Sequence, residues 1–251
     1  FWVSKEPNLT PGTHWGLSDD ILVAGSKSFD LPTEVFDLAE ISIAKSPDII
    51  GAIQLNIKSE CDGSIGEFGN KFWEEINDKL GEPIADKGLL REIYYRDRYL
   101  VTPLHASLLY QIISSLDENI NKQTHIEIAT ADINRSNVAP YSITDNWSSQ
   151  ESRDQVIRGS LEELTSSAVR LESSHRSNVA HNRELQLNFE SGESIKVFLD
   201  EGVGCWRSNG AKSFDFTAGV NRQIKLIISM TPTVRIAQAK IGTSIFIVND
   251  K

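Results

Sequence analysis

A β-prone segment that runs directly into a helical pattern restricts this chain to a layered α/β fold. Residues 89–100 are rich in aromatic and branched side chains and end with the charged pair Asp97 and Arg98. Thr102 can cap a helix that starts at Pro103, and an apolar stripe then continues for more than three turns. A strand, a short connection and a helix make the βα unit of α/β folds, in which ligands usually bind at the carboxyl end of the strand. Asp97 and Arg98 are therefore candidate site residues, and the alternative is a local ion pair that shapes the turn.

Two alternating segments farther along the chain predict a β-hairpin. Residues 185–189 and 195–199 alternate apolar and polar side chains, and the turn between them falls at Ser191-Gly192. His181 and Arg183 stand two residues apart just before the first strand, and in extended backbone such residues project from the same face. The pair can therefore converge on one anion, as at a phosphate site. The alternative is two structural hydrogen-bond donors on a solvated edge.

The remaining patterns divide the chain into a β-rich N-terminal part, residues 1–60, and a second part, residues 61–251. The clearest strand pattern of the first part covers residues 49–58. In the second part we expect, in order, a helix over 63–80, a strand over 125–130, a polar loop over 131–150, a helix over 151–168, a strand over 224–228 and a closing β-hairpin beyond Pro232.

Composition limits the partners that such a chain can bind. The 25 basic and 35 acidic residues give a formal charge of −10, which argues against a broad basic surface for nucleic acid or an anionic membrane but allows a local basic pocket. No apolar run approaches the roughly 20 residues of a membrane span. Cys61 and Cys205 form neither a metal set nor a disulfide framework, which indicates thiols in a reducing, cytoplasmic compartment. We expect no metal and no cofactor. The opening on Phe1 and not on Met is expected of a fragment or a processed product.

In the order of these elements, residues from about 60 to 230 resemble the phospholipase D-like C-terminal domain of the MIT-domain proteins and related bacterial modules. The resemblance rests on four places: the aromatic helix after Gly63, residues 93–100 leading into a helix, the strand with His181, Arg183 and Glu184, and Ile195-Lys196 before the turn at Gly202. It implies an α/β fold with a phospholipase D-like mixed sheet flanked by helices, to which the β-rich N-terminal part is added.

The resemblance also implies a phosphate site. In the catalytic superfamily a His-x-Lys motif occurs twice, with one His attacking phosphorus and the other protonating the leaving oxygen. His181 matches the nucleophile position and Arg183 replaces the Lys, which favours holding a phosphate through a planar fork. The sequence contains no second such motif, which only a homodimer would supply. The implied phosphate-binding residues are His181, Arg183, Arg98 and Lys196, with Asp97 or Glu184 orienting the basic groups.

Three functions follow as hypotheses. The leading one is a non-catalytic or weakly catalytic phosphate-binding module whose phosphodiester ligand is nucleic acid rather than lipid, of the kind found in bacterial defence or DNA-handling complexes. The first alternative is a dimeric, metal-independent phosphodiesterase or nuclease that uses His181. The second alternative is a protein-interaction scaffold inside a larger complex. The leading hypothesis places Arg98 and Arg183 in one pocket with Asp97 and Glu184 close by, because two arginines in a small site need acidic partners when no anion is bound.

Overall fold

The computed structural model describes residues 52–133, 147, 149–208, 219–229, 234–238 and 243–250. The chain divides into two compact units, residues 1–51 and 52–251, and the described residues all belong to the second. Most of the expected β-rich N-terminal part therefore lies outside the described residues. The strand expected within residues 49–58 is present as Ile53–Ile57, and it belongs to the main sheet of the second unit.

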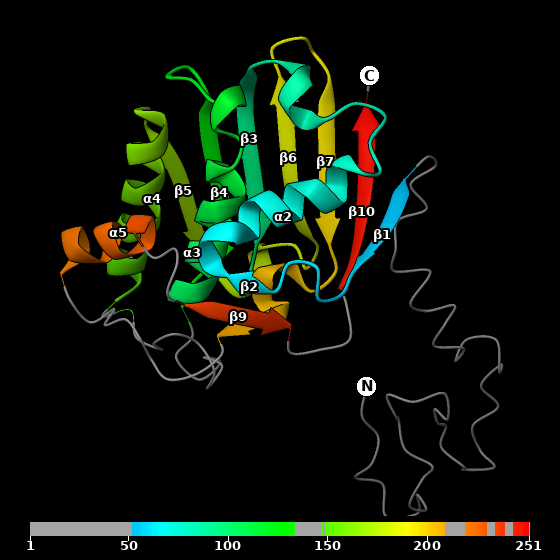
Figure 1. Cartoon of the computed structure of the whole chain (residues 1–251). Coiled ribbons are helices and arrows are strands. Elements are labelled where there is room, and N and C mark those ends of the chain that lie inside the picture. The colour runs from blue at the N-terminus through cyan, green and yellow to red at the C-terminus, as the bar shows by residue number, and fades with distance from the viewer. Residues whose placement is uncertain are drawn as a thin grey trace, which may run out of the picture. The chain divides into compact units, whose positions relative to one another are not determined.

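A seven-stranded mixed sheet forms the centre of this unit (Figure 1). Its strands stand in the spatial order β1-β10-β7-β6-β3-β4-β5. Their bounds are β1 Ile53–Ile57, β3 Leu90–Asp97, β4 His125–Ala131, β5 Val169–Ser174, β6 Arg183–Phe189, β7 Ser194–Leu199 and β10 Thr243–Asp250. β3, β4 and β5 are parallel, whereas each pair from β3 through β6, β7 and β10 to β1 is antiparallel. A second sheet contains three short strands, β2 Gly63–Ser64, β9 Arg235–Gln238 and β8 Trp206–Ser208.

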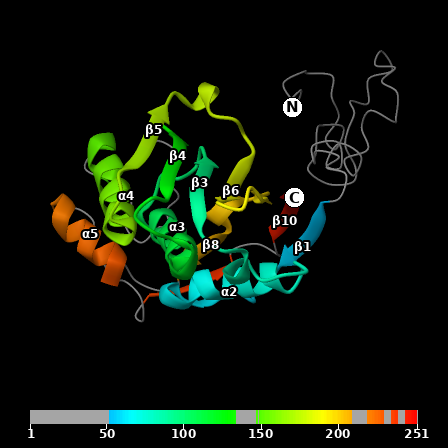
Figure 2. The ribbon, with the colours of Figure 1, turned by 90° about the horizontal axis from the view of Figure 1, so that it is seen from above.

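The described α-helices lie on one side of the large sheet, as Figures 1 and 2 show from two directions. They are α2 Ile65–Asn77, α3 Pro103–Ser114, α4 Gln150–Thr165 and α5 Val220–Ser229. Short 3-10 helices occur at η2 Ile84–Lys87, η3 Asp117–Asn119, η5 Arg176–Asn178 and η6 Gly202–Cys205. Alternate side chains of β3, β6 and β7 are buried toward the helices, as the alternation predicts for a sheet covered on one face. The expected mixed α/β sheet flanked by helices is confirmed.

The two segments with the clearest periodicity fold as their sequences predict. β3 runs into α3 through a short turn, and the side chain of Thr102 accepts a hydrogen bond from the backbone N–H of His105 as an N-cap. β6 and β7 form the predicted hairpin, and its turn residue Gly192 has a φ of 95° that favours glycine.

The strand expected over residues 224–228 is wrong, because this segment is part of α5. Val220, Ile224 and Ile227 are spaced four and three residues apart, so they share one face of a helix. That face packs on α4, where Ile224 fills the space beside Gly159. Residues 224–228 alone are rich in branched side chains and so resemble a strand. The helical spacing becomes evident only when Val220 is included.

The two cysteines are free and buried. Burial raises the pKa of the Cys61 thiol and of the Cys205 thiol to about 12. Both side chains are therefore protonated at neutral pH and act as small apolar groups of the core.

Close packing of α2 on α3 depends on Gly69. A Cβ atom at Gly69 would lie 2.0 Å from the backbone oxygen of Gln111 and 2.4 Å from Oγ of Ser115. The two helices are also joined by a hydrogen bond of 2.8 Å from Trp73 Nε1 to the backbone oxygen of Ile112. The missing side chain at Gly69 thus allows this approach of the two backbones.

We expect Gly69→Ala to destabilise the protein, although Ala normally stabilises a helix interior by about 1 kcal/mol relative to Gly. The added methyl group would push α3 from α2, and overpacking of this kind costs about 1–3 kcal/mol. Chemical denaturation would measure the loss. Gly81→Ala is the matched control, because nothing lies within 4 Å of a Cβ atom there. Equal unfolding free energies for the two variants would contradict this description of the packing.

Candidate functional site

The candidate site forms where β3 ends and β6 begins. The two strands are antiparallel with Arg96 opposite Glu184, so Asp97 at the end of β3 lies beside Arg183 at the start of β6. Nε of Arg183 is 3.6 Å from Oδ1 of Asp97, an ion pair that is longer than a hydrogen bond. Sequence positions 86 residues apart, 97 and 183, are thus joined at one edge of the sheet.

Asp97 organises this edge from a buried position. Its side chain accepts hydrogen bonds from the backbone N–H of Tyr99 at 2.7 Å and from the hydroxyl of Tyr95 at 3.1 Å. Burial raises the pKa of the Asp97 carboxyl, while the Tyr99 N–H, the Arg183 charge and the Tyr95 hydroxyl favour its ionised form and partly offset the rise. The carboxyl therefore fixes the turn that follows β3.

Four basic side chains surround the ring of Tyr99, and we call this group the Tyr99 cluster. The guanidinium carbons of Arg183, Arg176 and Arg98 lie 4.6, 5.0 and 5.7 Å from the ring centroid, within the range of cation–π attraction. The Tyr99 hydroxyl accepts a hydrogen bond from Nη2 of Arg176 at 3.0 Å and lies 3.3 Å from Nε2 of the exposed His181. Three arginines and a histidine from three separate segments therefore meet on one aromatic ring.

The connection between β5 and β6 explains how Arg176 and His181 reach this ring. β4 and β3 lie between β5 and β6 in the sheet, so residues 175–182 must cross past the ends of both strands. Figure 2 shows this connection passing from β5 to β6 on the side away from α2, α3 and α4. Arg176 near its start and His181 near its end are thereby both brought to the Tyr99 hydroxyl.

Arg183 is held firmly, whereas the other arginines are less constrained. Its side chain is only 10% exposed, and Nη1 donates to the backbone oxygen of Asp200. Gly202, with a φ of 60°, covers it so closely that a Cβ atom there would be 2.4 Å from Cδ of Arg183 and 2.8 Å from Oδ2 of Asp97. Arg98 is half-buried and Arg176 is exposed, and neither has an ion pair within the described part of the chain.

Buried donors in the cluster remain without acceptors. Nε of Arg98 and Nε of Arg183 are both buried and make no hydrogen bond to any described residue. An unsatisfied buried donor costs free energy, which an acceptor oxygen from a ligand would recover. The cluster therefore offers positive charge together with free hydrogen-bonding capacity, the chemistry that binds an oxyanion.

His105 holds the backbone of Tyr99 in place through a hydrogen bond. Its ring lies buried in the first turn of α3, and Nδ1 donates to the backbone oxygen of Tyr99 at 3.0 Å. The pKa of His105 is lowered from 6.5 to about 4, chiefly by burial and also by the charges of Arg207 and Arg183, while the hydrogen bond to the Tyr99 carbonyl opposes the change. His105 is thus a neutral structural residue that fixes the position of Tyr99.

The structure brings together four of the six residues singled out from the sequence. Asp97, Arg98, His181 and Arg183 all belong to the shared edge. Glu184 lies on the opposite face of the sheet, where it pairs with Arg96 at 2.5 Å, and Lys196 lies on that face in β7, opposite Gln186. Adjacent strand residues point to opposite faces, so Arg183 and Glu184 cannot enter one site together.

Three residues of the edge were not predicted from the sequence: Tyr99, Arg176 and His105. Tyr99 directly follows the candidate Arg98, so its position next to a charged strand end could have identified it as a site residue. Arg176 carried no such signal, because only the crossing of residues 175–182 brings it to Tyr99. Among the described residues, no group of three or more His, Cys, Asp or Glu side chains could hold a metal ion, and none of the described helices is long and apolar enough to span a membrane.

A comparison with protein families identifies the family of the chain. The model of the C-terminal domain of DEAD/DEAH box helicase YjiV matches residues 51–249, which is most of the chain. A search of curated proteins gave no match.

This match corrects the resemblance to phospholipase D-like domains, which is wrong. The resemblance depended on four short motifs, each of which is common in α/β folds, whereas the family model accounts for about two hundred consecutive residues. The role that the resemblance implied for His181, as one half of a phospholipase D pair, loses its basis, and the dimeric phosphodiesterase stays a hypothesis.

We expect Gly202→Ala to destabilise the protein by more than about 2 kcal/mol, because strain at positive φ and displacement of Arg183 add together. Gly192→Ala, at a φ of 95° but with nothing within 4 Å, isolates the backbone strain and should cost about 1 kcal/mol. Urea unfolding of both variants measures the difference. If Gly202→Ala costs no more than Gly192→Ala, Gly202 does not confine Arg183.

We expect His105 to make the protein sensitive to acid. Because the folded pKa is lowered to about 4, the unfolded chain binds the proton more tightly, so stability is retained above pH 6.5 and lost as the pH falls toward about 4. Between pH 7 and pH 5 this loss should amount to about 1–2 kcal/mol. His105→Asn keeps a donor for Tyr99 but does not titrate, so its unfolding free energy should fall less over the same range. An equal fall in both proteins would show that other groups cause the sensitivity.

Proposed function

We propose that this chain, which belongs to the family of the C-terminal domain of DEAD/DEAH box helicase YjiV, binds the phosphate backbone of nucleic acid through the Tyr99 cluster. Helicases act on nucleic acid, and a domain attached to a helicase motor has a use for an additional contact to the strand. In this proposal Arg98, Arg176, Arg183 and His181 bind phosphate oxygens, and Lys196 and Glu184 take no part.

The observation that carries the proposal is the unbalanced positive charge around Tyr99. Three guanidinium groups lie 4.6–5.7 Å from one ring centroid, and among the described residues their one ion pair is that of Arg183 with Asp97. Like charges at such distances repel one another unless an anion compensates them. A phosphate group would supply that charge, and its oxygens would accept from the guanidinium groups of Arg98 and Arg176, which have no ion pair among the described residues.

The arginines of the cluster differ in how far the surrounding residues enclose them. Arg183 is enclosed by Asp97, Gly202 and Tyr99, so its replacement would disturb the fold as well as any ligand. Arg98 and Arg176 keep no ion pair with described residues, and Arg176 is exposed. Arg98 and Arg176 are therefore the residues whose removal tests binding with the least effect on stability.

The net charge of the chain limits how strong this contact can be. A formal charge of −10 provides no broad attraction, so binding should rest on a few phosphates near the cluster. The salt dependence of the affinity should accordingly be shallow, at about 0.7–0.9 per phosphate on a log–log plot. The remaining affinity of a helicase for its substrate would come from its motor.

Fluorescence anisotropy with a labelled oligonucleotide tests the proposal. The double variant Arg98→Ala with Arg176→Ala should bind at least about tenfold more weakly than the unaltered chain, because two charge-assisted contacts of about 1 kcal/mol or more are lost. The log–log salt slope should fall by about 1–2 at the same time.

Arg158→Ala is the matched control. Arg158 is exposed in α4 and has no ion pair among the described residues, so its removal changes net charge without changing the cluster. If this control weakens binding as much as the double variant, the effect is one of net charge and the proposed site is wrong. Titration with anionic lipid vesicles serves as a second arm, and binding to vesicles in preference to the oligonucleotide would assign the cluster to a lipid headgroup.

A further inference from the structure

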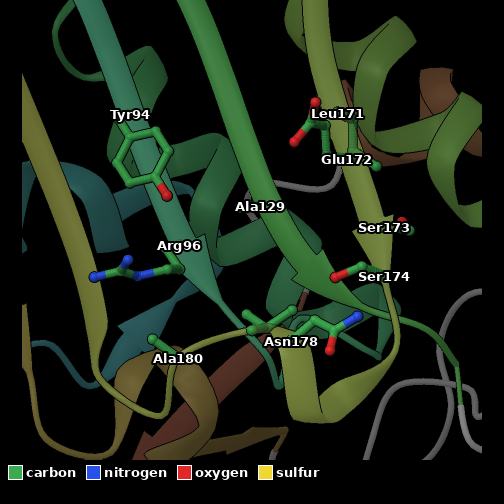
Figure 3. Close-up of a pocket in the computed structure, with 10 residues that line it drawn as sticks. Tyr94, Arg96, Ala129, Leu171, Glu172, Ser173, Ser174, Asn178 and Ala180 are labelled. Carbon is green, nitrogen blue, oxygen red and sulfur yellow. The ribbon is translucent and has the colours of Figure 1, made fainter.

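A pocket lies on the sheet face opposite the helices, next to the Tyr99 cluster. Its volume is about 570 Å³, and it lies between strands β3, β4 and β5 and the β5–β6 connection (Figure 3). Among its lining residues are Tyr94, Arg96, Ala129, Glu172, Ser174 and Asn178. Figure 3 shows the Tyr94 ring and the Arg96 side chain on one wall, with Ser174 and Asn178 across from them.

The pocket combines an aromatic wall with paired charges. Arg96 pairs with Glu184 at 2.5 Å, and the exposed Glu172 pairs with Arg170, so each charged group that lines the pocket already has an ion-pair partner, although the buried Nε of Arg96 makes no hydrogen bond to a described residue. The ring of Tyr94 lies 6.0 Å from the guanidinium carbon of Arg96. Such a pocket has little use for a second anion, but it suits a flat, uncharged ring that carries polar atoms on its edge.

The opposite wall of the pocket carries polar groups that could form hydrogen bonds with the edge of such a ring. Oδ1 of Asn178 accepts a hydrogen bond of 3.2 Å from Ser177, whereas its amide nitrogen bonds to no described residue. Asn178 is exposed, and the side chain of Ser174 is half-buried. An amide and a hydroxyl both donate and accept, so together they can bind the mixed donors and acceptors of a nucleobase edge.

The same short segment lines the pocket and supplies the Tyr99 cluster. Asn178, Val179 and Ala180 belong to the pocket, while Arg176 and His181 belong to the cluster. Because two residues of chain span at most about 7 Å, the backbone that lines the pocket lies within the length of about one nucleotide of the backbone that carries Arg176 and His181. We infer that the pocket binds a single unstacked nucleobase of a strand whose phosphate occupies the Tyr99 cluster, an inference that rests on the proposed function.

This arrangement selects single strands. In a duplex the bases are paired and stacked, so none can enter a pocket on a sheet face without being extruded at a cost. In a single strand the base is accessible, and stacking on an aromatic side chain is a common source of affinity that tolerates different bases. The chain should therefore bind single-stranded nucleic acid more tightly than a duplex of the same length.

An abasic oligonucleotide separates the pocket from the phosphate site. We would compare, by fluorescence anisotropy with the full chain, a short labelled oligodeoxythymidylate and the same backbone without its bases. The intact strand should bind about tenfold more tightly, the usual scale for one stacked base. Tyr94→Leu and, separately, Asn178→Ala should each reduce this ratio, whereas Arg98→Ala with Arg176→Ala should weaken both ligands equally.

Phe246→Leu is the matched control, because Phe246 is another half-buried aromatic side chain on the same sheet face but in β10, outside the pocket. It should leave the ratio unchanged. Tyr94→Leu could weaken binding by destabilising the fold. Asn178→Ala tests the pocket without that effect, because Asn178 is exposed and its replacement should leave the melting temperature unchanged. If intact and abasic strands bind equally, or if the ratio survives in both pocket variants, the nucleobase pocket is overturned while the proposed phosphate site stands. If neither strand binds, the proposed function itself fails.

Discussion

The buried carboxyl group of Asp97 fixes the edge of the sheet on which the candidate site depends. Burial opposes its ionised form, and the Tyr99 N–H, the Tyr95 hydroxyl and the Arg183 charge together offset part of that cost. In return the carboxyl holds the first residues after β3 and draws the start of β6 against them. His105 completes the support by donating to the Tyr99 carbonyl. The position of the Tyr99 ring therefore follows from a small buried polar network, which is stable only when its members are satisfied together.

An acidic chain that carries a local basic cluster can bind an anion without binding anions in general. The formal charge of −10 repels nucleic acid at long range, whereas in the proposed function the three arginines around Tyr99 would attract a phosphate only at contact. Such a domain would hardly increase the rate at which the protein encounters nucleic acid. It would instead help to position a strand that a helicase motor has already bound. The neighbouring polar pocket fits that role, because it would hold one base in a defined place.

Periodic segments could be predicted from the sequence, and contacts made by crossing connections could not. The β3–α3 unit and the β6–β7 hairpin each contain enough alternating or helical positions to decide their structure, whereas the short run at residues 224–228 was assigned to a strand because its helical face was not recognised. Asp97, Arg98, His181 and Arg183 were identifiable because they stand at strand ends. Glu184 and Lys196 were predicted in the same site as Arg183, but strand alternation places them on the other face of the sheet. Arg176 was beyond prediction, since its place depends on the order of strands in the sheet.

A structure of the chain with a short single-stranded oligonucleotide would test the central claim most directly. The account predicts a phosphate group within hydrogen-bond distance of the guanidinium groups of Arg98 and Arg176, with Arg183 still paired to Asp97 behind them. The result that would contradict it is an oligonucleotide bound at another surface while Arg98 and Arg176 keep the positions they have around Tyr99 without a ligand.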